Sequence, residues 1–287
     1  MTRILICPSA RPAVDLLASS TPLALTPLLG QSLLEYWLSH LACSGISQLT
    51  ILAHDQPEEI RALLGGGERW GMNLNVIDES RELTAAQALL KYAKELGPVP
   101  ESGAITVLDH FPGSPEYPLF TGYAEWFKAL LHWMPQAITP DRVGMRQLRP
   151  GVWAGIDSHI SPEARLVSPC WVGRHAFVGA RAVVGPDAIL EDGTFLEPAA
   201  EVVESCIGMD TFVGQFARIR NAIASRDLLI NCHTGCVTKV PDPFLLCALR
   251  APRRRIPRWR AKLTTLYAHN KEEASLLLKH LFLKKQG

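Results

Sequence analysis

The sequence lacks the features that mark membrane-spanning, exported and disulfide-stapled proteins. It has no run of about 18 apolar residues that could span a bilayer, and no charged start followed by an apolar stretch. Its seven cysteines are an odd number scattered without a framework spacing, which is typical of reduced thiols. We therefore expect a cytoplasmic protein.

Motifs of several catalytic classes are also missing. There is no P-loop and no Ser-His-Asp spacing, and the three glycines at 65–67 lack the G-x-G-x-x-G pattern of a dinucleotide loop. Cys232-His-Thr-Gly-Cys236 offers two cysteines and one histidine, which is an incomplete zinc set. His175 could serve as the base of a hexapeptide acyltransferase, but polar residues in repeat turns are mostly solvated.

The second half of the chain is built on a six-residue repeat. A small residue stands two positions before most of its aliphatic members, as Ala176 stands before Val178. Hexapeptide periodicity is the signature of a parallel β-helix, which we expect to be left-handed and to cover residues 148–240. The aliphatic members are Ile160, Leu166, Val172, Val178, Val184, Leu190, Leu196 and Val202, followed after a one-residue slip by Ile207, Val213 and Ile219.

The first half alternates between strand and helix patterns. Short apolar strands are expected at 3–7, 48–54, 74–77 and 105–108, and a last helix at 120–133. Ser32 with Glu35, and Thr84 with Gln87, have the spacing of capping boxes that open helices, and Asp55 is expected to cap another. Such alternation predicts an α/β domain over residues 1–147, with a parallel, Rossmann-like sheet between helices.

The charge is unevenly distributed along the chain. Residues 250–287 hold eleven lysines and arginines against two glutamates, a net charge of +9, which leaves the remaining residues at −8. We expect residues 241–287 to form a basic tail with a terminal helix. The tail either contacts an anionic membrane surface through its cations and Trp259, or packs against the protein itself with its arginines solvated. No nucleic-acid partner is expected, because no recognition motif accompanies the basic residues.

Several segments of the first half resemble the sugar-phosphate nucleotidyltransferases, or NDP-sugar pyrophosphorylases. Pro27-Leu-Leu-Gly-Gln-Ser-Leu-Leu-Glu-Tyr36 is similar to their P-V-x-G-K-P-L-L-E-Y segment, and Leu83-Thr-Ala-Ala-Gln-Ala-Leu89 to their G-T-A-G-A-L nucleotide-side loop. Leu64-Gly-Gly-Gly-Glu-Arg-Trp-Gly-Met72 resembles their L-G-D-G-S-R-F-G-V turn. The resemblance covers residues 1 to about 240, because many members carry a hexapeptide β-helix behind the catalytic domain. It implies nucleotide binding by Thr84, Gln87 and Asp109, with Asp109 as the metal ligand and Mg²⁺ as the metal.

The sequence also departs from the family pattern, chiefly where phosphates bind. The family's glycine-rich G-x-G-T-R-L loop is replaced by Pro8-Ser-Ala-Arg-Pro-Ala-Val-Asp-Leu16, in which Arg11 is a remnant and Pro12 lacks an amide donor. Gln31 stands in place of the family's lysine. The sugar-binding subdomain is shortened, and the only aspartate in the place of a second metal ligand is Asp141, beside an arginine.

These features leave three functional hypotheses open. The first is a nucleotidyltransferase-like protein of sugar-nucleotide and polysaccharide metabolism that binds a nucleotide or NDP-sugar with weak or absent catalysis, because positioned cations and amides supply most of the rate in such transfers. The second is a non-catalytic scaffold or regulatory subunit. The third is a hexapeptide acyltransferase. In each case we expect a homo-oligomer assembled through the β-helix.

Overall fold

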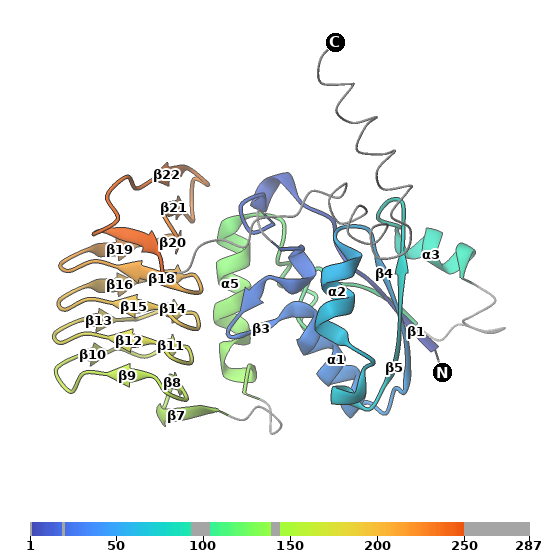
Figure 1. Cartoon of the computed structure of the whole chain (residues 1–287), viewed down its shortest axis with the longest axis horizontal. Coiled ribbons are helices and arrows are strands. Elements are labelled where there is room, and N and C mark those ends of the chain that lie inside the picture. Colours follow the sequence, from blue (N-terminus) through green and yellow to red (C-terminus); the bar gives the residue numbers. More distant parts are fainter. Residues whose placement is uncertain (1, 19–20, 93–103, 139–143, 250–287) are drawn as a thin grey trace, which may run out of the picture. The chain divides into compact units, whose positions relative to one another are not determined.

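The N-terminal part of the computed structural model contains a four-stranded parallel sheet (Figure 1). The structure describes residues 2–18, 21–92, 104–138 and 144–249. Strand order is β5-β4-β1-β6, and the expected parallel sheet is confirmed. The strands are β1 (Thr2–Ile6), β4 (Gln48–Ala53), β5 (Asn73–Asp78) and β6 (Ile105–Val107).

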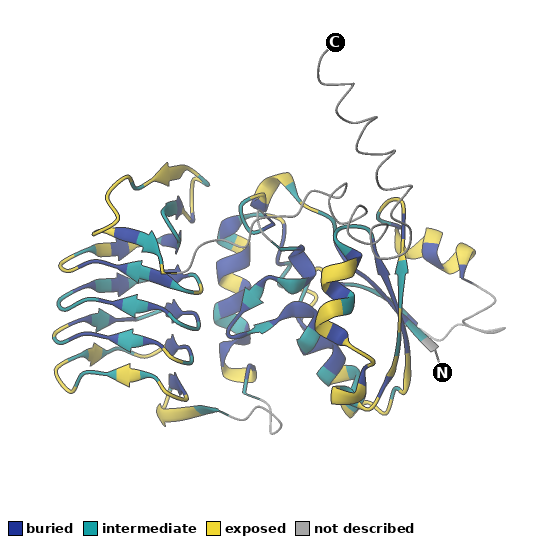
Figure 2. Cartoon of the chain, viewed as in Figure 1, coloured by how far each residue is buried: buried dark blue, intermediate teal, exposed yellow. Residues whose placement is uncertain are grey.

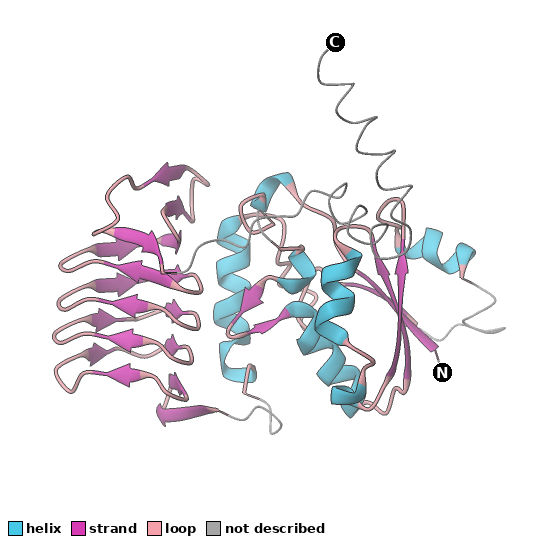
Figure 3. Ribbon diagram, viewed as in Figure 1, coloured by secondary structure: helices cyan, strands magenta, loops and turns pink. Residues whose placement is uncertain are grey.

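Helices cover both faces of this sheet. Leu5 packs into one apolar cluster with residues of α1 and α2, whereas its neighbours Ile4 and Ile6 point to the opposite face and pack with α3. Figure 3 shows these helices on either side of the strands. The domain is completed by α1 (Leu33–Cys43), α2 (Pro57–Leu64), α3 (Ala85–Lys91), α5 (Tyr123–Trp133) and the hairpin of β2 (Pro27–Leu28) and β3 (Gln31–Ser32), together with the short 3-10 helices η1 (Pro12–Val14), η2 (Leu23–Leu25), η3 (Glu68–Trp70) and η4 (Met134–Gln136).

Of the three helix caps that the sequence predicts, those of α1 and α3 are confirmed and that of α2 is not. The Ser32 hydroxyl accepts from the Glu35 amide while the Glu35 carboxylate accepts from the Ser32 amide, so the first capping box is confirmed. Thr84 and Gln87 form the second one in the same way. The expectation that Asp55 caps α2 is wrong. That helix begins at Pro57 after Gln56, which takes a left-handed conformation and makes no side-chain cap bond, so Asp55 lies one residue too early.

The second half stacks short parallel strands into three sheets, a β-helix-like arrangement that the repeat predicts (Figure 1). One coil usually takes 18 residues, so that Val178 pairs with Leu196, while the slip shortens the next coil and pairs Leu196 with Val213. The aliphatic members from Val172 to Val213 are fully buried and form the inner core. The sheets comprise β8 (Val152–Gly155), β11 (Cys170–Val172), β14 (Ala188–Leu190), β17 (Ser205–Ile207) and β20 (Ala222–Ser225); β9 (His159–Ile160), β12 (Phe177–Val178), β15 (Phe195–Leu196) and β18 (Thr211–Val213); and β10 (Arg165–Leu166), β13 (Val183–Val184), β16 (Glu201–Val203) and β19 (Arg218–Arg220).

Antiparallel strands close both ends of the stack. At the first coil, β7 (Met145–Arg149) pairs with β8. At the last coil, β21 (Leu228–Asn231) pairs with β20 and then with β22 (Val237–Lys239), and β23 (Leu246–Ala248) pairs with β18. The β-sheet structure therefore extends to Ala248, beyond the expected boundary at residue 240.

One sheet of the β-helix packs against the N-terminal domain. Outward side chains of its strands, among them Trp171 and Ile189, belong to the same buried cluster as Phe127 and Leu130 of α5. Figure 2 shows the burial along α5 and along these coils. The N-terminal domain and the β-helix consequently belong to one compact unit. The expected basic tail with its terminal helix lies, from residue 250 onward, outside the described residues. Within the described part, no helix is long and apolar enough to cross a membrane.

Candidate functional site

The carboxyl ends of the four parallel strands bring polar side chains together at one edge of the sheet. Ser9 and Arg11 follow β1, His54 follows β4, Glu79 and Glu82 follow β5, and Asp109 follows β6. Ligands of open parallel sheets bind at this edge, because loops from neighbouring strands converge there. We therefore take this edge as the candidate site.

The loop after β1 binds the side-chain carboxylate of Glu82. The Ser9 amide and hydroxyl donate to Glu82 Oε2, at 3.0 and 2.5 Å. The Arg11 guanidinium grips both carboxylate oxygens, with Nη1 at 2.6 Å from Oε2 and Nη2 at 2.5 Å from Oε1. Arg11 also donates to the carbonyl and hydroxyl oxygens of Ser9, at 3.2 and 3.0 Å, which fixes the guanidinium over the loop.

The proton equilibria of the pair reflect these contacts. Burial by itself would raise the pKa of Glu82, but hydrogen bonds from Arg11 and Ser9 outweigh it and lower this pKa to about 2. The Arg11 pKa is raised, chiefly by its hydrogen bond with Glu82, with a further contribution from the charge of Asp109. Glu82 is therefore ionised at every physiological pH, and Arg11 already has a partner.

Asp109 lies close enough to Arg11 to contribute to its electrostatic environment. Its carboxylate contacts His110 Nδ1 at 2.6 Å, and its side chain is 53% exposed. The backbone beneath it is fixed, because Leu119 donates to the Asp109 carbonyl and the Trp37 ring nitrogen donates to the His110 carbonyl. Asp109 thus presents one carboxylate at the sheet edge, half-exposed and in contact with His110. Among the described residues, no three histidine, cysteine or acidic side chains gather as a ready-made metal site.

The structure places the other two expected nucleotide-binding residues at the start of α3. The Thr84 hydroxyl accepts from the Gln87 backbone amide at 3.2 Å, and the Gln87 side-chain oxygen Oε1 accepts from the Thr84 backbone amide at 3.1 Å, so both side chains are engaged in the capping box. Both residues are exposed, and Thr84 follows Glu82 by two positions. The expected residues therefore share the sheet edge with Arg11 and Glu82.

A buried carboxylate, that of Glu79, supports the loop that carries the partly buried Glu82. Glu79 is 6% exposed, binds the Lys91 ammonium through both oxygens at 2.7 Å, and accepts from the Tyr92 hydroxyl. Burial would raise the pKa of Glu79, but the hydrogen bonds from Lys91 and Tyr92 lower it. The Glu79 carbonyl also contacts His54 Nδ1 at 3.1 Å. This cluster ties β4 and β5 to α3 and positions the loop that carries Glu82.

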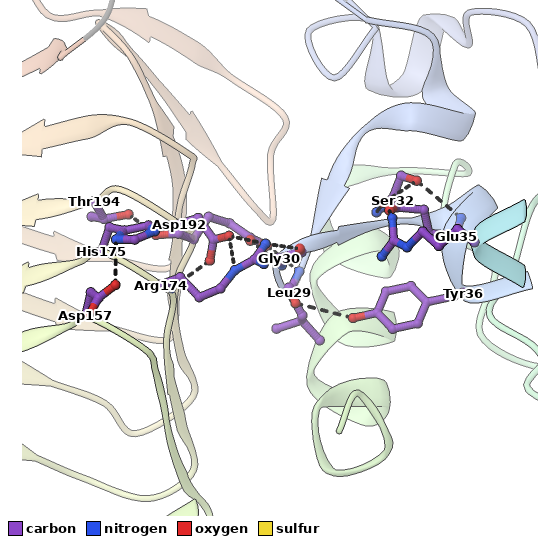
Figure 4. A network of polar contacts seen from close by, with 12 residues as sticks. Leu29, Gly30, Ser32, Glu35, Tyr36, Asp157, Arg174, His175, Asp192 and Thr194 are labelled. Carbon is purple, nitrogen blue, oxygen red and sulfur yellow. Dashed lines mark hydrogen bonds and ion pairs between the residues drawn. The ribbon is translucent and has the colours of Figure 1, made fainter. Parts of the chain in front are cut away.

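The hairpin of β2 and β3 is held by side chains of the β-helix (Figure 4). Leu29 and Gly30 form its two-residue turn, both with positive φ, so their amides point the same way. Both amides donate to the buried carboxylate of Glu191, at 2.5 and 2.8 Å. Arg174 donates to the Gly30 carbonyl at 2.9 Å and is itself paired with Asp192. Gln31, which replaces the family's lysine, immediately follows this clamped turn.

Sequence reasoning missed Glu82, Glu191 and Arg174. A faint signal existed for each: Glu82 directly precedes the Leu83-Thr84 motif, and Arg174 and Glu191 follow the repeat members closely, where the chain turns. None of these positions reveals its partner in the sequence, because Arg11 and Glu82 are 71 residues apart, Gly30 and Arg174 144, and Gly30 and Glu191 161.

Two other candidate sites named from the sequence, the Cys232–Cys236 turn and His175, lie in the second half of the chain. The Cys232–Cys236 turn is organised by Asn231, whose side-chain oxygen accepts from the amides of His233 and Thr234. Burial raises the pKa of Cys232 to about 11, so its thiol stays protonated. His175 lies 3.6 Å from Asp157, and both side chains are about two-thirds exposed, at 66% and 69%.

Comparison with known proteins supports the nucleotidyltransferase family for the N-terminal domain. Residues 17–115 match the family model described as nucleotidyl transferase. Among solved structures, a mutant of perosamine N-acetyltransferase from Caulobacter crescentus, in complex with CoA and GDP-perosamine, is 12% identical, with 61% of this chain and 92% of that chain covered and a TM-score of 0.18. A second mutant, of GDP-perosamine N-acetyltransferase from the same organism with the same ligands, is 13% identical over the same shares, with a TM-score of 0.16. At such TM-scores these two likenesses carry no argument.

Proposed function

We propose that this chain is a nucleotidyltransferase-like protein of sugar-nucleotide metabolism that binds a nucleotide or NDP-sugar with weak or absent transfer activity. The observation that carries the proposal is the match of residues 17–115 to the nucleotidyl transferase model. Those residues include β4, β5 and β6; Glu82 and Thr84 follow the carboxyl end of β5, and Asp109 follows that of β6. Thr84, Gln87 and Asp109 are the proposed ligand contacts.

Weak transfer is supported by the state of the loop after β1. Its one guanidinium and the Ser9 amide are both satisfied by Glu82, and Pro12 offers no N–H. Gln31 adds no positive charge where the family has lysine. Transfer of a nucleotidyl group needs fixed positive charge and donors around the phosphates, because these stabilise the charge that develops in the transition state. Removing one such donor typically costs about 100- to 1000-fold in rate.

In this proposal, a magnesium ion binds together with the nucleotide and is not a permanently bound cofactor. Asp109 supplies one exposed carboxylate, and Mg²⁺ in such sites is held by one or two carboxylates together with substrate phosphates and water. The ion would then neutralise phosphate charge when a nucleotide is bound. Asp109 is accordingly the proposed metal ligand.

A thermal-shift panel of nucleoside triphosphates and NDP-sugars, each with and without Mg²⁺, tests the binding proposal. A ligand that binds only the folded state at 100 times its Kd adds about 2.7 kcal/mol of stability. We expect one ligand class to raise the Tm of the native chain, and Asp109→Ala to abolish the Mg²⁺-dependent part of the shift. No response to any nucleotide or NDP-sugar would refute the binding proposal.

A pyrophosphate-release assay tests the proposed loss of transfer. The native chain is expected to release little or no pyrophosphate from a nucleoside triphosphate and a sugar 1-phosphate. Robust release that disappears in Asp109→Ala would show that the enzyme is active and that the loop after β1 does not disable it.

The alternative is a non-catalytic scaffold or regulatory subunit, and one observation favours it. The β-helix clamps the Leu29–Gly30 turn with Glu191 and buries Trp171 against the N-terminal domain, so the two halves form one unit.

We further propose that the β-helix is left-handed and forms a homo-oligomer, and that the protein works in the cytoplasm on polysaccharide precursors. An acyltransferase using His175 remains a third proposal.

A further inference from the structure

We propose that Ser9 and Arg11 form a binding site for a phosphate-class oxyanion, and that Glu82 is the intramolecular anion that fills this site in the free protein. The proposal rests on the proposed function only for the kind of ligand, and otherwise on the contacts of these three residues. Four donor–acceptor contacts, all of 3.0 Å or less, converge on one carboxylate.

The donors around Glu82 suit a phosphate as well as a carboxylate. An arginine fork binds the oxygens of either group through two parallel N–H bonds, and a backbone amide beside it is a usual phosphate contact. Ser9 adds a hydroxyl at 2.5 Å from the same oxygen that Arg11 Nη1 binds. A tetrahedral oxyanion in place of the carboxylate would therefore find every donor already oriented.

Glu82 is in a strong position to compete with a free ligand. Its carboxylate is charged, since its pKa is about 2, and it is tethered to the sheet edge by the loop between β5 and α3. Tethering gives a group an effective concentration on the order of millimolar or more. Asp109 adds a second negative charge near Arg11, which disfavours an incoming anion further. The native site is therefore expected to bind phosphate groups only weakly, and by displacing Glu82.

Displacement would also change the loop that carries the proposed nucleotide contacts. Glu82 is two residues before Thr84, the N-cap of α3. An oxyanion that takes over Ser9 and Arg11 releases this loop from β1. Occupation of the anion site and the position of Thr84 are thereby linked through the backbone between residues 82 and 84.

Titration calorimetry with inorganic pyrophosphate tests this inference on the full chain. Glu82→Ala removes the competing anion, and Glu82→Gln keeps the side-chain volume without the charge. Both variants are expected to bind pyrophosphate at least about tenfold more tightly than the native chain, a difference of about 1.4 kcal/mol. The gain should shrink as salt is raised, because it depends on Arg11.

Two matched variants separate this effect from a general change in charge. Glu201→Gln removes a charge of the same sign from an ion pair with Arg218 and Arg220 on the β-helix, and is expected to bind pyrophosphate like the native chain. Combining Glu82→Ala with Arg11→Ala is expected to erase the gain. Tighter binding that persists without Arg11, or that Glu201→Gln reproduces, would overturn the inference.

A measurement on the native chain decides the matter if the Glu82 variants fail to fold. High-millimolar pyrophosphate should perturb the Ser9 amide resonance, because displacing Glu82 changes the acceptor of that amide, and an unperturbed Ser9 would overturn the inference. The proposed function fails separately. If Glu82→Ala folds but binds pyrophosphate no more tightly than the native chain does, and the native chain binds a nucleotide, only the anion-site inference is refuted. If Glu82→Ala binds pyrophosphate more tightly but the native chain responds to no nucleotide, only the proposed nucleotide binding is refuted.

Discussion

The Glu191 carboxylate accepts a hydrogen bond from the Gly30 amide at 2.8 Å, although the two residues are 161 positions apart. Glu191 ends one coil of the β-helix and is only 2% exposed, while Gly30 completes the β2–β3 turn of the N-terminal domain. A buried carboxylate is tolerated here because two neighbouring amides satisfy it. The contact fixes the Leu29–Gly30 turn, which precedes Gln31, at a defined place against the β-helix.

Glu191→Gln should destabilise the protein by about 1–3 kcal/mol, because an amide side chain can satisfy only one of the two N–H groups and directs its own donor at the other. Chemical denaturation followed by tryptophan fluorescence measures the loss. In Glu197→Gln, the replaced β-helix carboxylate accepts one hydrogen bond, from the Gln215 backbone amide at an exposed site. This control substitution should reduce the stability less than Glu191→Gln does. Equal stability of the native chain and Glu191→Gln would show that the clamp contributes little.

Glu82 should make stability depend on pH in the acid range. Its folded-state pKa of about 2 is below the ordinary value of 4.5, so its stabilising contribution is complete above pH 4.5 and is lost as the pH falls toward 2. The loss amounts to at most about 3 kcal/mol over that interval. Urea midpoints measured across it should fall less steeply for Glu82→Gln than for the native chain. Identical slopes for the two proteins would contradict the strong pairing with Arg11.

An aliphatic position in the inner core of the β-helix should lose stability when a hydroxyl without a partner is introduced there. Val184 is fully buried in the core, whereas its neighbour Val183 on β13 points outward and is only half-buried. Val184→Thr should cost about 1–3 kcal/mol, since it buries an unsatisfied hydroxyl, and Val183→Thr no more than about 0.5 kcal/mol. Melting temperatures of the two isosteric variants give the comparison. Equal losses at both positions would mean that the inward and outward faces of this strand are not distinguished.

The basic tail remains a prediction, because residues 250–287 are outside the described part of the chain. Its net charge of +9 predicts attachment to anionic membranes, with on the order of 1 kcal/mol per cation near the surface. Co-sedimentation with liposomes should require acidic lipid, weaken as salt rises and disappear when residues 250–287 are deleted. Binding that ignores lipid charge, or that survives the deletion, would rule out this role for the tail.

Much of the fold could be read from short-range patterns. The six-residue spacing of residues such as Val178 and Leu196 reflects a strand and turn of fixed length, so it reports the stacking directly. The capping boxes at Ser32 and Thr84 span four residues and were found for the same reason. Asp55 was assigned wrongly because the left-handed conformation of Gln56, rather than residue type, decides where α2 begins.

The candidate site was only partly predictable. Thr84, Gln87 and Asp109 could be named as candidate nucleotide contacts only through the resemblance to the nucleotidyltransferases, and in the structure they follow the ends of β5 and β6. The sequence also showed that the loop after β1 lacks glycine and that Gln31 replaces a lysine. It did not show that Arg11 is already paired, since nothing in the spacing of Arg11 and Glu82 indicates a contact.

The sequence by itself determined the two architectures, since periodicity and capping act over a few residues and are written in neighbouring positions. Only the tertiary structure decided which buried or half-buried carboxylate meets which donors. Glu82 reaches Ser9 and Arg11 across the sheet edge, and Glu191 reaches Leu29 and Gly30 from another domain. Such pairings depend on how whole elements pack, and an ionised group drawn out of water must find its partners wherever packing brings them.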